Sequence, residues 1–138
     1  MIRRAHGTLN VLIVDDEKDL LETLVKRLEK RNLPSTGVES AEKAILLMRK
    51  KEFDVVILDI KLPGGMDGIE ALREMKKIQP MTEVILLTGH SSIEAGVDGI
   101  KLGAFDYILK PVRLEDLFPK ILLAVEKKKT ARRSGKVK

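Results

Sequence analysis

The sequence predicts an α/β fold, a doubly wound five-stranded parallel sheet, on three observations. Strand-like and helix-like stretches alternate five times along the chain, which is typical of this class. The strand-like stretches are short apolar runs and therefore indicate buried strands. A polar residue follows each of four runs, at the sheet edge where open parallel sheets bind ligands. These runs are residues 11–14, 55–58, 84–87 and 107–109.

The first half of the chain is predicted to hold three strands and two helices. After the first strand, apolar residues at helical spacing predict an amphipathic helix over about residues 17–31. Residues 34–38 form a short, weak second strand, and Ser40 is the expected N-cap of the next helix. The third strand covers residues 53–58. The apolar face of the second helix consists of Ala41, Ala44, Ile45 and Met48.

The pattern continues with a third helix, for which Asp67 is the expected cap, and with a fourth strand that ends at Thr88. Ser91 and Glu94 predict a capping box at the start of the fourth helix. That helix is expected to end near Gly103 and to be the least rigid, because two internal glycines each cost about 1 kcal/mol relative to alanine. These glycines are Gly96 and Gly99.

The last strand is predicted over residues 104–109 and is followed by a fifth helix that contains a proline. Pro119 would cost about 3 kcal/mol in a helix interior because it loses a backbone bond and clashes one turn back. Either this helix begins near Asp116, which places Pro119 in its first turn, or it is kinked. Its inner stripe consists of Leu114, Leu117, Phe118, Ile121 and Val125.

The composition indicates one soluble globular domain. The chain has 138 residues, of which 43% are hydrophobic and 34% are charged, and this length suits a single core. No apolar stretch approaches the roughly 20 residues of a membrane span, and residues 1–7 lack the apolar region of a signal peptide. The absence of cysteine excludes disulfides and thiolate ligands, so any metal is held by oxygen. We predict a cytoplasmic protein with no membrane contact.

Positive charge is concentrated at the end of the chain. Seven lysines and arginines lie in residues 127–138, although the whole chain has a net charge of only +5, so the remainder is mildly acidic. Such a tail offers salt-sensitive phosphate contacts to nucleic acid. It lacks interleaved aromatic residues and a recognition helix, so we interpret it as a solvated linker or disordered terminus. We expect no nucleic-acid binding by this chain alone.

Three carboxylates are predicted to meet at one edge of the sheet. Asp15 and Asp16 follow the first strand, and Asp59 follows the third. Clustered carboxylates repel one another unless a cation neutralises them, and Mg²⁺ prefers such oxygens while leaving positions open for a phosphate. The alternative is that Asp15 and Asp16 only cap the first helix and that Asp59 is a turn former.

Asp59 is the candidate acceptor of a phosphoryl group. A carboxylate that attacks phosphorus forms an acyl phosphate, and the transfer mainly needs positioning and neutralisation of the phosphoryl oxygens. The Lys110 ammonium and the Thr88 hydroxyl are candidate partners of those oxygens. Taken singly, Lys110 fits a solvated lysine and Thr88 a locally bonded residue. Pro111 fixes the turn after the last strand, and the joint pattern favours one shared site.

Five ordered motifs give the chain a family resemblance. They are Val-Asp-Asp at 14–16, Leu-Asp-Ile at 58–60, Pro-Gly-Gly-Met-Asp-Gly at 63–68, Leu-Thr-Gly at 87–89 and Gly-Ala-Phe-Asp-Tyr-Ile-Leu-Lys-Pro at 103–111. With them the chain resembles the receiver domains of two-component response regulators, the CheY-like superfamily. The resemblance implies a (βα)5 flavodoxin-like sheet, and the family itself supplies the strand order 2-1-3-4-5. It also implies an N-terminal extension over residues 1–7, a receiver domain over 8–126 and a basic tail or linker over 127–138.

The resemblance implies a signalling switch, not an enzyme that acts on other molecules. A sensor histidine kinase or a histidine phosphotransfer protein would donate the phosphoryl group in a Mg²⁺-dependent reaction. The domain would catalyse only its own phosphorylation and dephosphorylation. It would then control a downstream protein or a fused output domain, as a monomer or a weak phosphorylation-dependent dimer.

The family pattern also implies a role for each residue of the metal site. Asp59 matches the phosphoacceptor. Asp16, an Asp59 oxygen and the backbone carbonyl of Lys61 would bind Mg²⁺ directly, whereas Asp15 would act largely through water.

The same pattern implies the residues of the switch. Thr88 matches the switch hydroxyl, and Lys110 matches the lysine that pairs with the phosphate. Tyr107 matches the aromatic residue whose ring turns inward when Thr88 moves, the alternative being a static surface aromatic. The peptide bond between Lys110 and Pro111 is expected to be cis.

Two features depart from the family pattern. Gly64 and Gly65 make the loop beside Asp59 one residue longer, so we expect a more mobile loop. Pro119 lies on the surface that many relatives use to dimerise, which puts that mode of assembly in doubt.

Two rival functions fit the sequence less well than the switch. A hydrolase of the haloacid-dehalogenase type needs a second acid two residues after its nucleophile, and Lys61 occupies that position. A receiver kept only as a docking module is expected to lose site residues, and none is lost here.

Overall fold

The computed structural model describes residues 9–134, which form five strands and five α-helices in alternation. The first half contains β1 (Val11–Val14), α1 (Lys18–Glu29), β2 (Ser35–Val38), α2 (Ala41–Met48) and β3 (Val55–Asp59). The second half contains α3 (Gly68–Ile78), β4 (Glu83–Thr88), α4 (Ile93–Lys101), β5 (Asp106–Leu109) and α5 (Leu114–Ser134). The predicted extension over residues 1–7 and the tail residues 135–138 lie outside the described residues.

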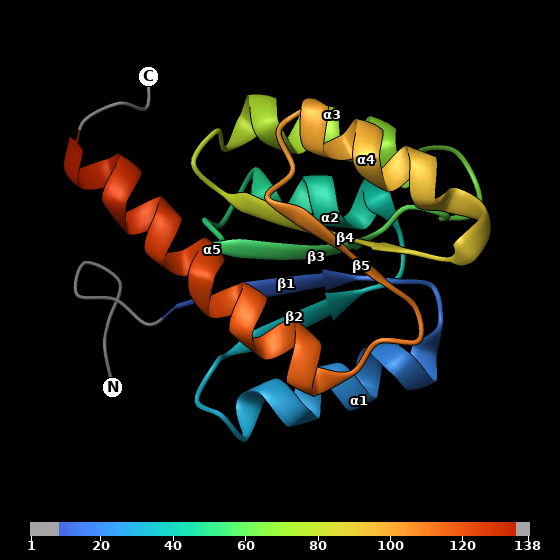
Figure 1. Ribbon diagram of the computed structural model, residues 1–138, viewed down its shortest axis with the longest axis horizontal. Coiled ribbons are helices and arrows are strands. Elements are labelled where there is room, and N and C mark those ends of the chain that lie inside the picture. Colours follow the sequence, from blue (N-terminus) through green and yellow to red (C-terminus); the bar gives the residue numbers. More distant parts are fainter. Residues whose placement is uncertain (1–8, 135–138) are drawn as a thin grey trace.

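The strands form one parallel sheet in the order β2-β1-β3-β4-β5 (Figure 1). The predicted fold class and strand order are therefore confirmed. Asp59 pairs with Leu87 on β4, and Thr88 pairs with Leu109 on β5. This register brings the carboxyl ends of β1, β3, β4 and β5 to one edge of the sheet.

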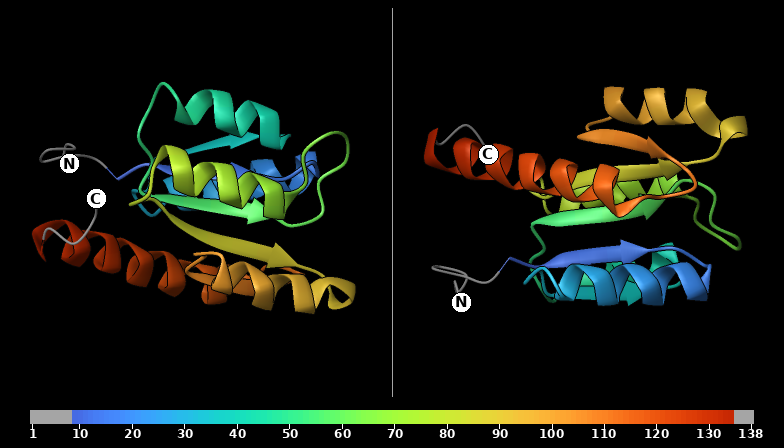
Figure 2. Two further views of the ribbon diagram at one scale, coloured as in Figure 1. Left: turned by 90° about the horizontal axis from the view of Figure 1, so that it is seen from above. Right: turned by 60° about the horizontal axis from the view of Figure 1, so that its bottom comes forward.

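Helices cover both faces of the sheet, as Figures 1 and 2 show: α2, α3 and α4 lie on one face, and α1 and α5 lie on the other. Each face buries its own apolar core, and burying one large aliphatic side chain contributes about 1.5–3 kcal/mol. The strands β1, β3 and β4 are buried throughout. The sheet is therefore a rigid platform for the residues at its carboxyl edge. Helical residues of the two cores include Ala44, Met48, Leu72 and Met75 on one face and Leu24, Leu28, Leu117 and Ile121 on the other.

Two of the three predicted helix starts are confirmed. Ser40 accepts a hydrogen bond from the Lys43 N–H, and Asp67 forms a capping box with Glu70. The capping box predicted at Ser91 is wrong, because a short 3-10 turn, η1 (His90–Ser92), occupies that position and α4 begins at Ile93.

The position of Pro119 excludes one of the two alternatives left open by the sequence. The helix α5 begins at Leu114, so Pro119 lies in the helix interior and not in its first turn. The reason is that Leu114 and Leu117 are already buried against the sheet, and the Arg113 carbonyl accepts the first backbone bonds of the helix.

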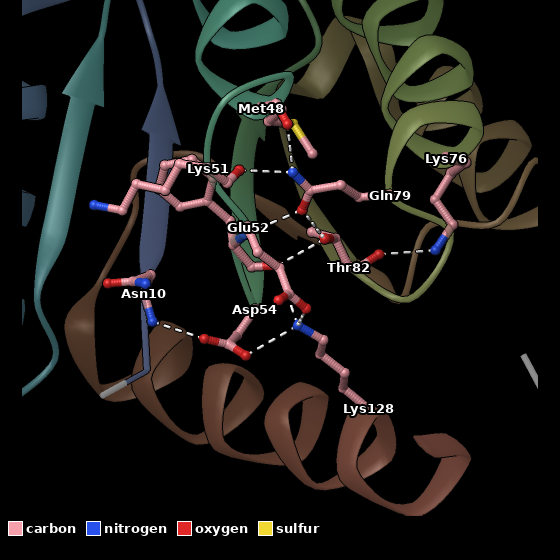
Figure 3. A network of polar contacts seen from close by, with 10 residues as sticks. Asn10, Met48, Lys51, Glu52, Asp54, Lys76, Gln79, Thr82 and Lys128 are labelled. Carbon is pink, nitrogen blue, oxygen red and sulfur yellow. Dashed lines mark hydrogen bonds and ion pairs between the residues drawn. The ribbon is translucent and has the colours of Figure 1, made fainter. Parts of the chain in front are cut away.

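The helix α5 continues past residue 126, and one lysine of the predicted tail belongs to the body of the domain. Lys128 is only 3% exposed, so the expectation of a solvated tail is wrong for this residue. Its ammonium donates to Asp54 Oδ1 at 3.0 Å and to Glu52 Oε2 at 3.1 Å (Figure 3). Asp54 Oδ2 in turn accepts the Asn10 N–H at 2.7 Å. Burial of a charge requires such partners.

We expect Lys128→Ala to lower the free energy of unfolding by about 3 kcal/mol, because the buried carboxylate of Asp54 loses a cation that neutralises it. The neighbouring Lys129 is the matched control. Its side chain is 46% exposed and lies 3.8 Å from Oε2 of the exposed Glu126, so Lys129→Ala is expected to cost at most about 1 kcal/mol. Urea unfolding of both variants measures the difference. Equal losses would show that the Lys128 network does not stabilise the domain.

Candidate functional site

The candidate site lies at the carboxyl edge of the sheet, where backbone hydrogen bonds continue past the strand ends. The Asp15 N–H donates to the Val38 carbonyl, and the Lys110 N–H donates to the Thr88 carbonyl at 2.7 Å. The Lys110–Pro111 peptide bond is cis, as the resemblance implied. The backbone therefore fixes where these side chains begin.

Lys110 connects the carboxylates of the site. Its Nζ atom lies 3.2 Å from Asp59 Oδ2, 3.1 Å from Asp15 Oδ2 and 3.0 Å from Glu17 Oε1. The structure therefore brings Lys110 and Asp59 together across 51 positions of sequence. An ammonium at this position neutralises negative charge beside Asp59.

The predicted acidic cluster is also assembled. Asp15, Asp16 and Asp59 each place a carboxylate oxygen within 4.8 Å of the others. Asp15 and Asp59 are buried, whereas Asp16 is exposed. These oxygens are the hard ligands that Mg²⁺ prefers.

One oxygen of the cluster is suited to a cation. Asp15 Oδ2 is fully buried and has no hydrogen-bond partner among the described residues, although it lies at ion-pair distance from Lys110. Asp15 Oδ1 accepts the Glu17 N–H at 2.9 Å. Burial of a carboxylate is costly unless its charge is neutralised, and the Lys110 ammonium is shared among three carboxylates, so a bound cation would stabilise the cluster. The three acids therefore fit a hydrated divalent metal.

Burial and mutual repulsion shift the ionisation of this cluster. Burial, followed by the charge of Asp15, raises the pKa of Asp59 above its ordinary value of 3.8, although Lys110 opposes the shift. Burial likewise raises the pKa of Asp15. Burial lowers the pKa of Lys110, but the hydrogen bond to Glu17 and the charges of Asp15 and Asp59 outweigh it and raise the net value. The site therefore holds two carboxylates whose ionised forms are disfavoured by burial, next to an ammonium whose charged form is favoured.

Thr88 and Tyr107 lie on the neighbouring strands β4 and β5, and their side chains have other partners. Thr88 is buried at the end of β4, and among the described residues its hydroxyl donates to the Gly89 carbonyl at 3.2 Å. Tyr107 is half-buried and packs below α4, where a Cβ atom on Gly96 would lie only 3.1 Å from its ring. The glycine thus allows close contact between α4 and the ring. The structure brings Asp15, Asp16, Asp59 and Lys110 together. The Thr88 hydroxyl is instead bonded to the adjacent residue, Gly89.

The loop after Asp59 is tied down on both sides. The Lys61 N–H donates to Asp59 Oδ1 at 3.2 Å, and the Met66 N–H donates to Glu42 Oε2 at 2.8 Å. Gly68 lies against the Asp59 carbonyl so closely that a Cβ atom would clash with it. The loop that carries the additional glycine is therefore anchored to Asp59 and to α2.

The sequence analysis missed two polar residues at this edge. Glu17 bonds to Lys110, and Ser91 accepts a hydrogen bond from Lys61 Nζ at 2.9 Å. The signal that could have identified Glu17 is its residue type. It lies at the start of the first helix, where glutamate is not a favoured N-cap residue. Ser91 carried no signal that separated a loop contact from a helix cap.

Comparison with known proteins decides the family. The family model described as "Response regulator receiver domain" matches residues 11–122. The chain belongs to this family. As a receiver domain of two-component systems, with the CheY-like fold, it is a signalling domain.

Curated relatives agree with this membership. The chain is 38% identical over 110 residues to a putative response regulator, NtrX-like, of Rickettsia bellii, which covers 79% of the chain and 23% of that protein. It is 36% identical over 107 residues to the regulatory protein AtoC of Escherichia coli K12, covering 78% of the chain and 23% of that protein. The chain thus spans about a quarter of the length of these relatives.

Solved structures show the same fold. A response regulator receiver domain protein from Clostridium thermocellum superimposes with a TM-score of 0.84 at 35% identity, covering 88% of this chain and 98% of the other. NtrX from Brucella abortus gives a TM-score of 0.86 at 31% identity, over 94% of this chain and 29% of the other. Within residues 9–134, no helix combines the length and the apolar character needed to cross a membrane.

Proposed function

We propose that this receiver domain accepts a phosphoryl group on Asp59 from a sensor histidine kinase or a histidine phosphotransfer protein. The observation that carries the proposal is the Lys110 ammonium, which lies 3.2 Å from the nearly buried Asp59 carboxylate beside a cluster suited to a cation. The site offers an anionic nucleophile together with positive charge for an incoming anion.

In the transfer step, one Asp59 carboxylate oxygen forms a bond to phosphorus. The bond from phosphorus to the donor's nitrogen or oxygen breaks, and its electron pair leaves with the donor. Asp59 becomes an acyl phosphate, which water later hydrolyses. Lys110 pairs with a phosphoryl oxygen, and the Thr88 hydroxyl turns from the Gly89 carbonyl towards another.

The residues that would hold Mg²⁺ are Asp16, Asp59 and the Lys61 backbone carbonyl, with Asp15 acting largely through water. The clustered carboxylate oxygens of Asp15, Asp16 and Asp59 support this proposal. When bound, the ion supplies positive charge that lowers the repulsion between the carboxylates and an anionic donor.

We propose that phosphorylation controls a downstream protein or a fused output domain. The relatives support fusion, because the chain spans about a quarter of their length and one of them, NtrC of Salmonella typhimurium, is named a DNA-binding transcriptional regulator. The receiver would extend from residue 8 past residue 126 to include Lys128, and the rest of the basic segment would connect it to an output domain. Thr88 and Tyr107 would form the switch, in a monomer or a weak phosphorylation-dependent dimer.

Acetyl phosphate tests this proposal without the kinase. In the presence of Mg²⁺, we expect the mass of the chain to rise by one phosphoryl group. EDTA is expected to prevent the gain, because the acidic cluster repels the donor unless a cation is bound. Intact-mass spectrometry measures both states. No adduct with Mg²⁺, or an equal adduct in EDTA, would refute the proposal.

A further inference from the structure

The Lys110 ammonium has three carboxylate neighbours, and only two of them have a role in the proposed transfer. Asp59 is the proposed acceptor, and Asp15 belongs to the proposed metal site. The third, Glu17, lies nearest to the ammonium, at 3.0 Å. An ammonium has only three protons to donate, so the contact with Glu17 uses a hydrogen-bond donor that a phosphoryl oxygen would need.

The backbone places Glu17 for this contact. It is the N-cap residue of α1 and has an extended backbone, but its side chain makes no capping hydrogen bond. Its N–H instead donates to Asp15 Oδ1 at 2.9 Å, which fixes the start of the side chain beside the cluster. The carboxylate then reaches Lys110, 93 positions later in the chain.

We propose that Glu17 is a positioning residue that holds the Lys110 ammonium in the resting site and competes with the phosphoryl oxygens for it. This proposal rests on the proposed function of Asp59 and Lys110. On phosphoryl transfer, Asp59 loses its free carboxylate and a bound metal draws on Asp15. Glu17, whose side chain is 62% exposed, is the one neighbour of the three that has no other assigned task.

Competition and structural support predict opposite changes in the affinity for a phosphoryl mimic when Glu17 is removed. If Glu17 only supported the site, its loss would weaken the binding of a phosphoryl mimic. If it competes, its loss strengthens that binding, because Lys110 no longer exchanges one carboxylate for the ligand. An exposed ion pair is worth up to about 1 kcal/mol, which corresponds to an affinity change of up to about fivefold.

The test compares Glu17→Gln with the wild-type chain at saturating Mg²⁺. Beryllofluoride, a phosphoryl mimic, is expected to bind Glu17→Gln about three- to fivefold more tightly, as measured by ¹⁹F NMR titration. The KM for acetyl phosphate is expected to fall by the same factor, while the maximal rate of phosphorylation stays within about twofold. Glu17→Asp, which shortens the side chain by one methylene and so weakens the contact, should shift the affinity in the same direction as Glu17→Gln.

Asp19→Asn is the matched control. Asp19 is exposed in the first turn of the same helix, so this variant removes the same charge from the same region without touching Lys110. Its affinity for beryllofluoride is expected to match the wild type. Unchanged or weaker binding in Glu17→Gln, or an equal gain in Asp19→Asn, would overturn the role of Glu17. Failure of the wild-type chain to bind beryllofluoride with Mg²⁺ would instead refute the proposed function.

Discussion

Replacing Asp59 with asparagine is expected to abolish phosphoryl uptake from acetyl phosphate. The amide keeps the shape of the side chain but has no anionic oxygen to attack phosphorus. Phosphorylation should fall from about one group per chain to below about 2% of that level, because removing a nucleophile eliminates the covalent route. Intact-mass spectrometry with Mg²⁺ measures the loss, and Asp19→Asn should be labelled like the wild type. Full labelling of Asp59→Asn would place the acceptor elsewhere.

The stability of Asp59→Asn tests whether this variant still folds. Because burial and Asp15 raise the pKa of Asp59 above 3.8, the ionised carboxylate destabilises the folded chain. This cost is absent below about pH 3.8, develops as the pH rises through the raised folded pKa, and stays at higher pH. Without Mg²⁺, Asp59→Asn should therefore be more stable than the wild type at neutral pH, and the difference should shrink on acidification. Urea unfolding at several pH values measures it, and a less stable variant at neutral pH would contradict the assignment.

The strand ends made much of the fold and site predictable from the sequence. Each apolar run specifies a buried strand, and parallel strands bring their carboxyl ends to one edge. Asp59 and Lys110 therefore had to converge, and their separation of 3.2 Å agrees. Asp67 and Ser40 were predictable for a similar reason, since helix caps depend on neighbouring residues alone.

Other features depend on contacts that local patterns do not specify. Glu17 acts on a residue 93 positions away, and the η1 turn moved the start of α4 beyond Ser91. Lys128 lay in a uniformly basic run, although the inner stripe of α5, extended by one turn past Val125, reaches it. Only the position of Asp54 at the opposite edge of the sheet explains why a lysine is buried there.

The face formed by α4, β5 and α5 is the expected route from Asp59 to a partner. A phosphoryl group switches the domain only if one of two conformations binds the new charge better. We propose that Thr88 and Lys110 would supply those differential contacts, because each has another partner in the resting structure. We expect α4 to move at low cost, because it contains two glycines, and its outer face exposes three apolar side chains. They are Ile93, Val97 and Ile100.

Beryllofluoride with Mg²⁺ is expected to change hydrogen exchange mainly in residues 88–110. We expect the Thr88 hydroxyl to leave the Gly89 carbonyl and the Tyr107 ring to turn inward below α4. Mobile elements come from the least stable parts of a fold. A coupling of about 1–3 kcal/mol corresponds to changes of roughly 5- to 150-fold in exchange rate. Thr88→Ala should reduce them several-fold, whereas Thr23→Ala, at an exposed position of α1, should not. Changes confined to residues 59–68 would show that the signal ends at the loop beside Asp59.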